Sequence, residues 1–293
     1  MEQQSTVETN ATRRKQIRGR INYVEMTVIY IILGVLTVIY VLPFLWLISS
    51  AFKAPTEIFT NPIIWIPKIL KWDNFYRATH DIPFFLYLRN TLIIVAGCLV
   101  GSLISNSIVA YGFAKLKWKG RNALFIVVLI TMMIPFQIIM IPQFLFFHKI
   151  GWIGTFLPLI VPAFFGNAFF IFLLRQFFIG IPNEISQAAK VDGANEFVIF
   201  SRIVLPLSTA GLATVGIFTF LNTWNDFVGP LIFLSSDKKY TLALGIQQIM
   251  SVNDPRWNIL MAAGVLMTVP VLVLFFLLQR YFIQGIAFSG IKG

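Results

Sequence analysis

The sequence is poor in the residues that build catalytic and metal sites. It has one cysteine, Cys98, and two histidines, His80 and His148, which lie far apart. One cysteine excludes an intrachain disulfide, and the histidines lack the spacing of a metal site. The chain also has no P-loop, nucleophile elbow or zinc-protease motif. We therefore expect no catalytic residue, metal or cofactor on this chain. If the protein performs work that requires energy, we expect another chain to supply that energy.

Charged residues are also scarce, at 12% of the 293 residues against roughly 25% in ordinary soluble domains. Apolar residues make up 57% of the chain. Six apolar runs are long enough for a helix to cross a hydrocarbon core of about 30 Å, namely residues 26–50, 91–113, 123–147, 155–174, 207–234 and 259–278. No run alternates as a barrel strand does. The sequence therefore predicts an all-α polytopic membrane protein with six transmembrane helices.

Basic residues flank these runs. Residues 1–25 form a basic tail that carries Arg13, Arg14, Lys15, Arg18 and Arg20, and the loop KLKWKGR at 115–121 carries four more with no acid. The first run is too long for a signal-peptide core, so we interpret it as an uncleaved anchor. The net charge of +11 does not by itself indicate nucleic acid, because the basic residues flank membrane spans, where they set topology. Their distribution predicts cytoplasmic N- and C-termini.

Two of the runs contain features that a plain span does not need. The second has Gly97 and Gly101 at the spacing that lets helices pack closely, and Asn106, which should face protein. The third has Pro135 and Pro142 beside two glutamines. Proline kinks a helix, so this run is either an ordinary kinked helix or a helix that gates or lines a cavity.

The fifth run contains a polar cluster, Asn222, Thr223, Trp224, Asn225 and Asp226. A carboxylate is costly in lipid unless it is solvated or paired. The cluster is either the point where the helix enters water or the wall of a cavity. Its amides, aromatic ring and carboxylate, with apolar residues continuing beyond it, favour a cavity wall that a solute passes.

A long loop, about residues 235–257, follows on the predicted external side. It carries Gln247 and Gln248 and a turn signal at Asn253, Asp254 and Pro255. A simple connector could be much shorter. We therefore expect a partner to contact this loop from outside.

Residues 182–194, PNEISQAAKVDGA, lie between the fourth and fifth runs on the predicted cytoplasmic side. Pro182 stops the preceding helix, Asn183 is a good N-cap, and Glu184 suits a first turn. Gly193 permits a turn, and a second apolar stripe at helical spacing follows as far as Pro206. The pattern predicts two short helices on the membrane surface, over about 180–206.

The order of residues in this loop resembles the EAA loop of ABC importer permeases. The matching residues are Gln187-Ala188-Ala189, Asp192-Gly193-Ala194, then Phe200, Ile203, Leu205 and Pro206. Gln187 stands where the family usually has Glu, and Glu184 lies one turn earlier. AYGFAKLKWKGR, WNDF, YTLALGIQQ and the terminal GIKG resemble the smaller permease of maltose and multiple-sugar importers, a group that includes an alginate-oligosaccharide importer.

The resemblance implies a type I ABC importer permease fold, with one six-span domain over residues 26–293. It implies a second permease, two ATPase subunits that hold ATP and Mg, and an extracytoplasmic sugar-binding protein, in a bacterial cytoplasmic membrane. The ATPase-coupling residues would be Glu184, Gln187, Ala188, Ala189, Asp192, Gly193, Ala194 and, in the cytoplasmic tail 280–293, Lys292. Asn222, Thr223, Trp224, Asn225 and Asp226 would line the substrate pathway. Gln247, Gln248, Asn253 and Asp254 would meet the binding protein.

Other functions stay open at this point. An ABC permease for a non-sugar solute has the same architecture. An ion-coupled transporter is less favoured because the chain shows no internal repeat and one acid within its runs. A membrane enzyme would need clustered acids or histidines. Sugar charge is also undecided, because Asp226 would repel an acidic oligosaccharide whereas external Lys53, Lys68, Lys71 and Arg77 would attract one.

Overall fold

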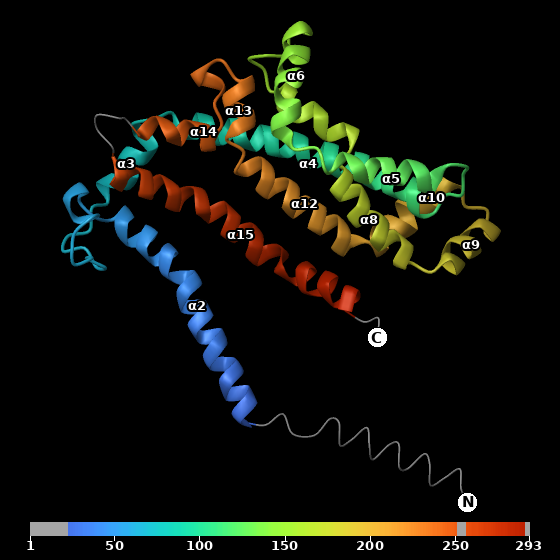
Figure 1. Cartoon of the computed structure of the whole chain (residues 1–293), viewed down its shortest axis with the longest axis horizontal. Helices are drawn as coiled ribbons and strands as arrows, with labels where there is room; N and C mark the ends of the chain where they lie inside the picture. Colours follow the sequence, from blue (N-terminus) through green and yellow to red (C-terminus); the bar gives the residue numbers. More distant parts are fainter. Residues whose placement is uncertain (1–22, 251–255, 291–293) are drawn as a thin grey trace, which may run out of the picture.

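The chain folds into helices joined by short turns. The computed structural model describes residues 23–250 and 256–290, and within them no strand occurs (Figure 1). The helices of the first half are α2 (Tyr23–Ala51), η1 (Pro55–Glu57), α3 (Asp73–His80), α4 (Phe84–Ala114), α5 (Arg121–Thr131), α6 (Phe136–Lys149), α7 (Leu157–Ile160) and η2 (Val161–Phe165). The second half contains α8 (Ala168–Gly180), α9 (Asn183–Val191), α10 (Glu196–Ile199), η3 (Phe200–Val204), α11 (Leu205–Leu207), α12 (Thr209–Trp224), α13 (Val228–Phe233), η4 (Asp237–Lys239), α14 (Leu242–Ile246), η5 (Gln247–Ile249) and α15 (Trp257–Gly290).

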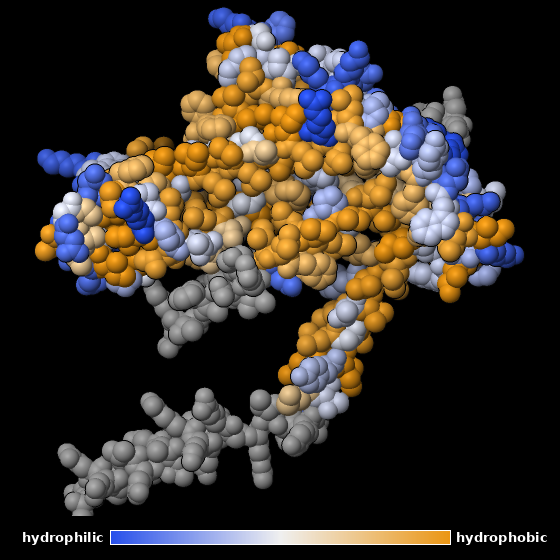
Figure 2. All heavy atoms as spheres, turned by 180° about the vertical axis from the view of Figure 1, so that it is seen from behind, coloured by the Kyte–Doolittle hydropathy of each residue, from blue (hydrophilic) through white to orange (hydrophobic). Residues whose placement is uncertain are grey.

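Helix α4 runs along the body, and its two ends carry different structures. Figure 1 shows α3 and α14 at one end and α9 and α10 at the other, with α12 lying between α4 and α15. Figure 2 shows that apolar side chains cover most of the face it presents, with hydrophilic side chains toward the edges. That distribution is expected of a body embedded in lipid.

Helix α2 leaves the body as an arm. The C-terminal end of α2 meets α15 (Figure 1), and the apolar side chains of α2 are exposed along most of its length. The predicted first run, 26–50, falls inside it. The basic tail before Tyr23 lies outside the described residues.

The glycine spacing in the second run does produce close packing. A Cβ atom on Gly97 would overlap Ile160, and one on Gly101 would overlap Phe164. Ile160 belongs to α7 and Phe164 to η2. Because the two glycines have no side chains, the broken fourth segment can lie directly against α4. Helix α4 itself begins seven residues before the predicted start of this span.

The structure corrects two of the predicted spans. The third is not a kinked helix, because α5 and α6 meet at 94° around residues 132–135. The fifth is not continuous over 207–234, because α12 ends at Trp224 and α13 begins at Val228. Among the described residues, four helices are long and apolar enough to span, or up to six if each bent pair is one span. Helix α15 also runs on past residue 278 to Gly290.

A buried polar junction ties α2, α3 and α15 together at one end of the body. The Asn74 amide donates to the carbonyls of Ala51 and Lys53, both at 2.9 Å. Asn258 donates in turn to the Asn74 carboxamide oxygen at 2.6 Å. Lys53 has no exposed surface, and among the described residues its ammonium donates only to Ser50 Oγ, at 3.5 Å. Burial lowers the pKa of Lys53, and the negative charge of Glu57 opposes that shift.

We expect Lys53→Met to stabilise the protein by about 1 kcal/mol or more, because a buried cation without a close anion costs free energy. The folded-state pKa lies below the ordinary 10.5, so the unfolded chain binds more protons between the two values. The free energy of unfolding of the natural chain should therefore rise with pH across that window. Thermal unfolding of the full chain in detergent at pH 7 and pH 10 measures both effects.

The variant's advantage should shrink as pH rises toward 10.5. The exposed Lys68 provides a matched control, because Lys68→Met removes the same charge from water and should change little. A destabilised Lys53→Met at neutral pH contradicts the interpretation.

Candidate functional site

The loop over 180–206 folds as two short helices around a glycine turn. Helix α9 runs from Asn183 to Val191, so Pro182 occupies the N-cap position and the prediction that Asn183 is the N-cap is wrong. Gly193 then adopts a φ of 85°, in the left-handed region that a side chain disfavours. The amide of Ala194 donates to Ala189 at 2.9 Å and closes the turn. Asn195 caps the next helix through Val198, so the helix-turn-helix prediction is confirmed.

The two faces of this loop differ in exposure. Ala189 and Ala194 pack against a buried cluster that includes Tyr111, Ile181 and Ile199. Most of the predicted coupling residues are exposed, namely Glu184, Gln187, Ala188, Asp192 and Gly193. Two large apolar side chains, Val191 and Phe197, are exposed beside them. Val191 is 88% exposed, which is unusual for a valine beside a packed cluster. The outer face is therefore suited to burial against a partner.

The C-terminal end of α4 anchors the loop. Lys115 donates to the Ile181 carbonyl at 2.6 Å and to Asn183 Oδ1 at 3.1 Å. The Tyr111 hydroxyl donates to Glu196 at 2.6 Å, and Glu196 also pairs with Lys190 of α9. The Lys190 and Tyr111 hydrogen bonds lower the pKa of Glu196. Its carboxylate is thus ionised at neutral pH and ties α9, α10 and α4 into one unit.

The chain returns from this loop through a distorted helix. Residues Phe200–Val204 form a π-helical turn, and the amide of Leu205 donates back to Phe200. Pro206 follows, and the segment Glu196–Leu207 meets α12 at 78°. A π turn of this kind often marks a functional position in a helix. Here it lets the surface loop turn into the membrane-crossing α12.

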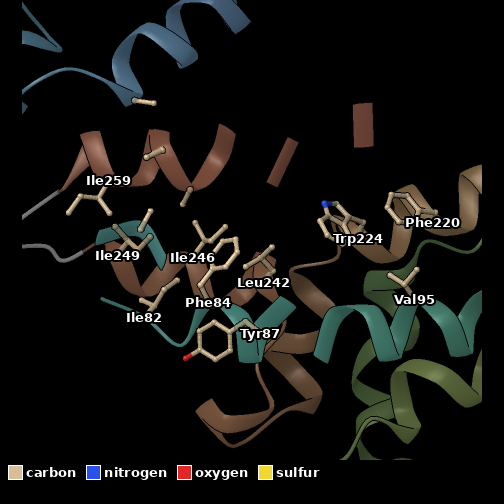
Figure 3. Close-up of a cluster of buried hydrophobic side chains, with 14 residues drawn as sticks. Ile82, Phe84, Tyr87, Val95, Phe220, Trp224, Leu242, Ile246, Ile249 and Ile259 are labelled. Atoms are coloured by element: carbon tan, nitrogen blue, oxygen red, sulfur yellow. The ribbon is translucent and has the colours of Figure 1, made fainter. Parts of the chain in front are cut away.

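The N-terminal end of α4 anchors the other predicted contact segment. Asn90 donates to the carbonyls of Lys238 and Tyr240, both at 3.0 Å, and Thr91 accepts from the Leu242 amide at 2.8 Å. Figure 3 shows Tyr87 of α4 beneath Leu242 and Ile246. A Cβ atom on Gly245 would overlap the Tyr87 ring. Helices α14 and η5 are therefore seated closely on α4.

Gln247 and Gln248 lie at the exposed edge of this seated segment. The carboxamide oxygen of Gln248 accepts a hydrogen bond from the Tyr87 hydroxyl at 2.8 Å, which fixes its direction. Asn253 and Asp254, predicted to act with them, lie outside the described residues, as does Lys292. Arg256, where the described chain resumes, pairs with Asp81 at 2.5 Å.

The structure divides the polar cluster over 222–226. Helix α12 ends at Trp224, which agrees with the helix-end alternative. Trp224 is buried, stacks on Phe220 and donates to the Met267 carbonyl at 3.2 Å. Asn222 and Asn225 are exposed, and Thr223 and Asp226 are half-buried. Asp226 accepts from the Gly229 amide at 3.0 Å and so caps the start of α13.

A buried polar network in the middle of the body was only partly predicted. Asn106 is fully buried, donates to the Ser102 carbonyl at 2.6 Å and accepts from the Asn167 amide at 2.6 Å. Thr219 of α12 donates to Ser102 Oγ at 3.1 Å. The sequence indicated that Asn106 faces protein, but its partner Asn167 lies 61 residues further along the chain, and Thr219, the partner of Ser102, lies 117 residues beyond Ser102.

No group of acids, cysteines and histidines able to hold a metal occurs in the described residues. His80 stacks on Tyr76, and His148 lies in the last turn of α6. The site is thus two anchored segments at opposite ends of α4, with a polar break in α12–α13 between them.

Comparison with known proteins supports this arrangement. Residues 93–288 match a family model described as the inner membrane component of binding-protein-dependent transport systems. The chain is 38% identical over 258 residues to the arabinooligosaccharides transport system permease protein AraQ of Halalkalibacterium halodurans, covering 87% of this chain and 92% of the relative. It is 31% identical to AraQ of Bacillus subtilis, over 88% of this chain and 92% of that relative.

A solved structure shares the fold. It belongs to a bacterial ABC transporter involved in the import of the acidic polysaccharide alginate. The match has a TM-score of 0.78 at 23% identity and covers 90% of this chain and 98% of that one. The expected ABC importer permease fold is thereby confirmed.

We expect Gly193→Ala to loosen the turn after α9. The substitution meets no neighbouring atom, so its cost is conformational, about 1–2 kcal/mol for a non-glycine residue in the left-handed region. Amide hydrogen exchange over residues 183–199 should become faster in the variant. Gly180→Ala is the matched control, because Gly180 is helical and also has open space. Unchanged exchange at 183–199 in Gly193→Ala would contradict this account of the turn.

Proposed function

The chain belongs to the family of binding-protein-dependent transport system inner membrane components, and we propose that it is one of two permease subunits in an ATP-driven importer of oligosaccharides. Members of this family are membrane components of transport systems rather than enzymes. The observation that carries the proposal is the pair of anchored segments at opposite ends of one helix, α4. A subunit that receives solute on one side and energy on the other needs two such contacts.

The cytoplasmic contact is made by α9 and its turn. Val191 and Phe197 present apolar surface, while Gln187 and Asp192 present polar groups beside it. A cleft on an ATPase subunit, which would hold ATP and Mg, would cover this face. The Tyr111–Glu196–Lys190 network then carries movement of α9 into α4. Gln187 is neutral, so the contact at that position depends on amide hydrogen bonds rather than on charge.

The external contact is made by the segment over 235–257. Its base, α14 and η5, is fixed on α4, and Gln247 and Gln248 stand at its exposed edge. A substrate-binding protein would dock there, with Asn253 and Asp254 completing the contact. Docking at this end and ATPase closure at the other rock the spans between outward- and inward-open arrangements.

The break between α12 and α13 provides polar groups for the solute pathway. Asn222 and Asn225 are exposed, and Thr223 and Asp226 are partly so. Their hydroxyl, amide and carboxylate groups suit the hydroxyls of a sugar. Trp224 serves the core and is not available for stacking on a solute. The second permease, a homologous but different chain, would form the opposite wall.

The membrane orientation follows from the basic segments. The tail before residue 26 has five basic and three acidic residues, and the loop 115–121 has four basic residues and no acid; this bias supports a cytoplasmic location for both segments and both termini. The protein then resides in the bacterial cytoplasmic membrane. Helix α9 and Lys292 lie on the ATPase side, and the segment 242–250 lies outside.

We favour a neutral oligosaccharide as substrate. A relative at 38% identity carries an arabinooligosaccharide name, but a Bacillus subtilis relative at 31% identity over 90% of this chain carries a polygalacturonan/rhamnogalacturonan name, so the relatives do not separate neutral from acidic sugars. The choice rests on Asp226, the acid at the described α12–α13 break, whose negative charge would repel an acidic sugar.

The test is ATPase turnover of the complex isolated by a tag on this chain and placed in lipid nanodiscs. Cognate binding protein is added with neutral or uronic-acid oligosaccharides in turn. We expect ATPase subunits to co-purify and neutral oligosaccharides to stimulate turnover. Absence of ATPase subunits after gentle solubilisation argues against the importer, and stimulation by uronic-acid oligosaccharides alone reverses the assignment of charge.

We expect Val191→Ser to weaken association with the ATPase subunits about tenfold. Burying a valine side chain contributes about 1.5 kcal/mol, which is close to tenfold in a dissociation constant. Val191→Ile keeps the apolar surface and is the matched control. Titration of ATPase subunits onto the nanodisc-embedded permeases measures both affinities. Equal affinities for the two variants remove Val191 from the interface.

A further inference from the structure

The loop between α4 and α5 forms an open pocket that the transport function does not use. Its volume is about 260 Å³. The residues lining it are Lys117, Trp118, Gly120, Arg121, Asn122 and Ala123. It lies where one span ends, at Ala114, and the next begins, at Arg121. That position is the depth of the lipid headgroups.

The lining of this pocket includes two basic side chains and no acidic one. The sequence has no Asp or Glu between Asp81 and Glu184, so neither α4, α5 nor the loop between them can neutralise Lys117 and Arg121. None of the ion pairs among the described residues includes either side chain. A third cation, Arg175, is near enough to Arg121 for their charges to interact, and its guanidinium lies 4.2 Å from the centre of the Phe125 ring.

The backbone adds donors to the same place. Helix α5 begins after Gly120, whose φ of 85° turns the chain and which offers no side-chain cap. The first N–H groups of a helix need acceptors from outside it. The first N–H groups of α5 lie beside Lys117 and Arg121, and the Asn122 side chain adds a further amide. Together these groups suit an anion with several oxygen acceptors, such as a phosphodiester.

One wall beside the pocket is apolar and exposed. Leu124, Val127 and Ile130 of α5 are each at least half exposed. Trp118 is 41% exposed, and its indole N–H is already bonded to the Gly112 carbonyl, so its ring is the part left for contact. A free phosphate ion would make no favourable contact with these apolar side chains. Acyl chains lying along α5 would cover them.

We propose that this pocket binds the headgroup of an anionic phospholipid, with the phosphodiester held by Lys117, Arg121 and the first turn of α5. The acyl chains lie along the exposed side of α5. Basic pockets between spans at the membrane surface are suited to such headgroups. The bound lipid neutralises the loop and holds the α4–α5 corner at the headgroup depth. This inference does not depend on the transported solute.

The test uses the purified full chain in detergent and counts bound lipid by native mass spectrometry. Phosphatidylglycerol is titrated against phosphatidylcholine, with inorganic phosphate as a soluble competitor. Lys117→Gln/Arg121→Gln should weaken phosphatidylglycerol binding about thirty-fold, at about 1 kcal/mol for each basic residue near the headgroup. Phosphatidylcholine binding should be unchanged. Lys68→Gln/Lys71→Gln is the matched control, because it removes two exposed charges from outside the pocket.

A second variant guards against misfolding. Arg121 also donates to the Leu116 carbonyl at 3.0 Å, so its loss could disturb the turn. Lys117 makes no hydrogen bond within the described residues, and Lys117→Gln alone should weaken binding about five-fold. Equal binding of the two lipids by the natural chain overturns the proposal, as does equal loss in the control. Displacement of phosphatidylglycerol by millimolar inorganic phosphate would show a phosphate site and not a lipid site.

Discussion

The carboxamide of Asn106 is the contact on which the middle of the structure depends. Lipid leaves no water for an unpaired backbone group, so each break in a membrane-embedded helix must find a protein partner. The fourth segment breaks between η2 and α8, and the Asn167 amide at that break bonds to Asn106. Through Ser102 the same network reaches Thr219 of α12. One fully buried side chain thus allows a span to be interrupted while three helices stay in register.

Helix α4 gains its importance from this central attachment. Its 31 residues extend about 46 Å, so Tyr87 and Tyr111 lie at opposite ends of one rigid element. Tyr87, Asn90 and Thr91 hold the segment over 238–250, while Tyr111 and Lys115 hold the loop over 181–196. Both contact segments are therefore attached to the same helix by hydrogen bonds and packing. A displacement of the segment at one end of α4 is therefore expected to move the segment attached at the other end.

Sequence patterns predicted the surface loop well because its signals are local. Pro182 and Gly193 each fix a nearby backbone conformation, and the structure places a helix start and a turn where they indicate. Asn183 is the first residue of α9 and not its cap, because its side chain is bonded to Lys115 of α4. The 94° angle after α5 could not be predicted, since Pro135 marks a break but packing sets its angle. Trp224 shows a further limit. Its inward direction follows from Met267, which is 43 residues away, and no pattern in residues 222–226 specifies that partner.

The shortness of α12 has a consequence for the surrounding bilayer. Its 16 residues extend about 24 Å, less than a hydrocarbon core of about 30 Å. The π turn before it and the Asn225–Asp226 break after it therefore bring backbone and polar side chains below the level of the headgroups. Such hydrophobic mismatch is relieved by local thinning of the membrane or by water entering from the ends. A membrane thinned at α12 would shorten the apolar barrier that a hydrophilic solute has to cross.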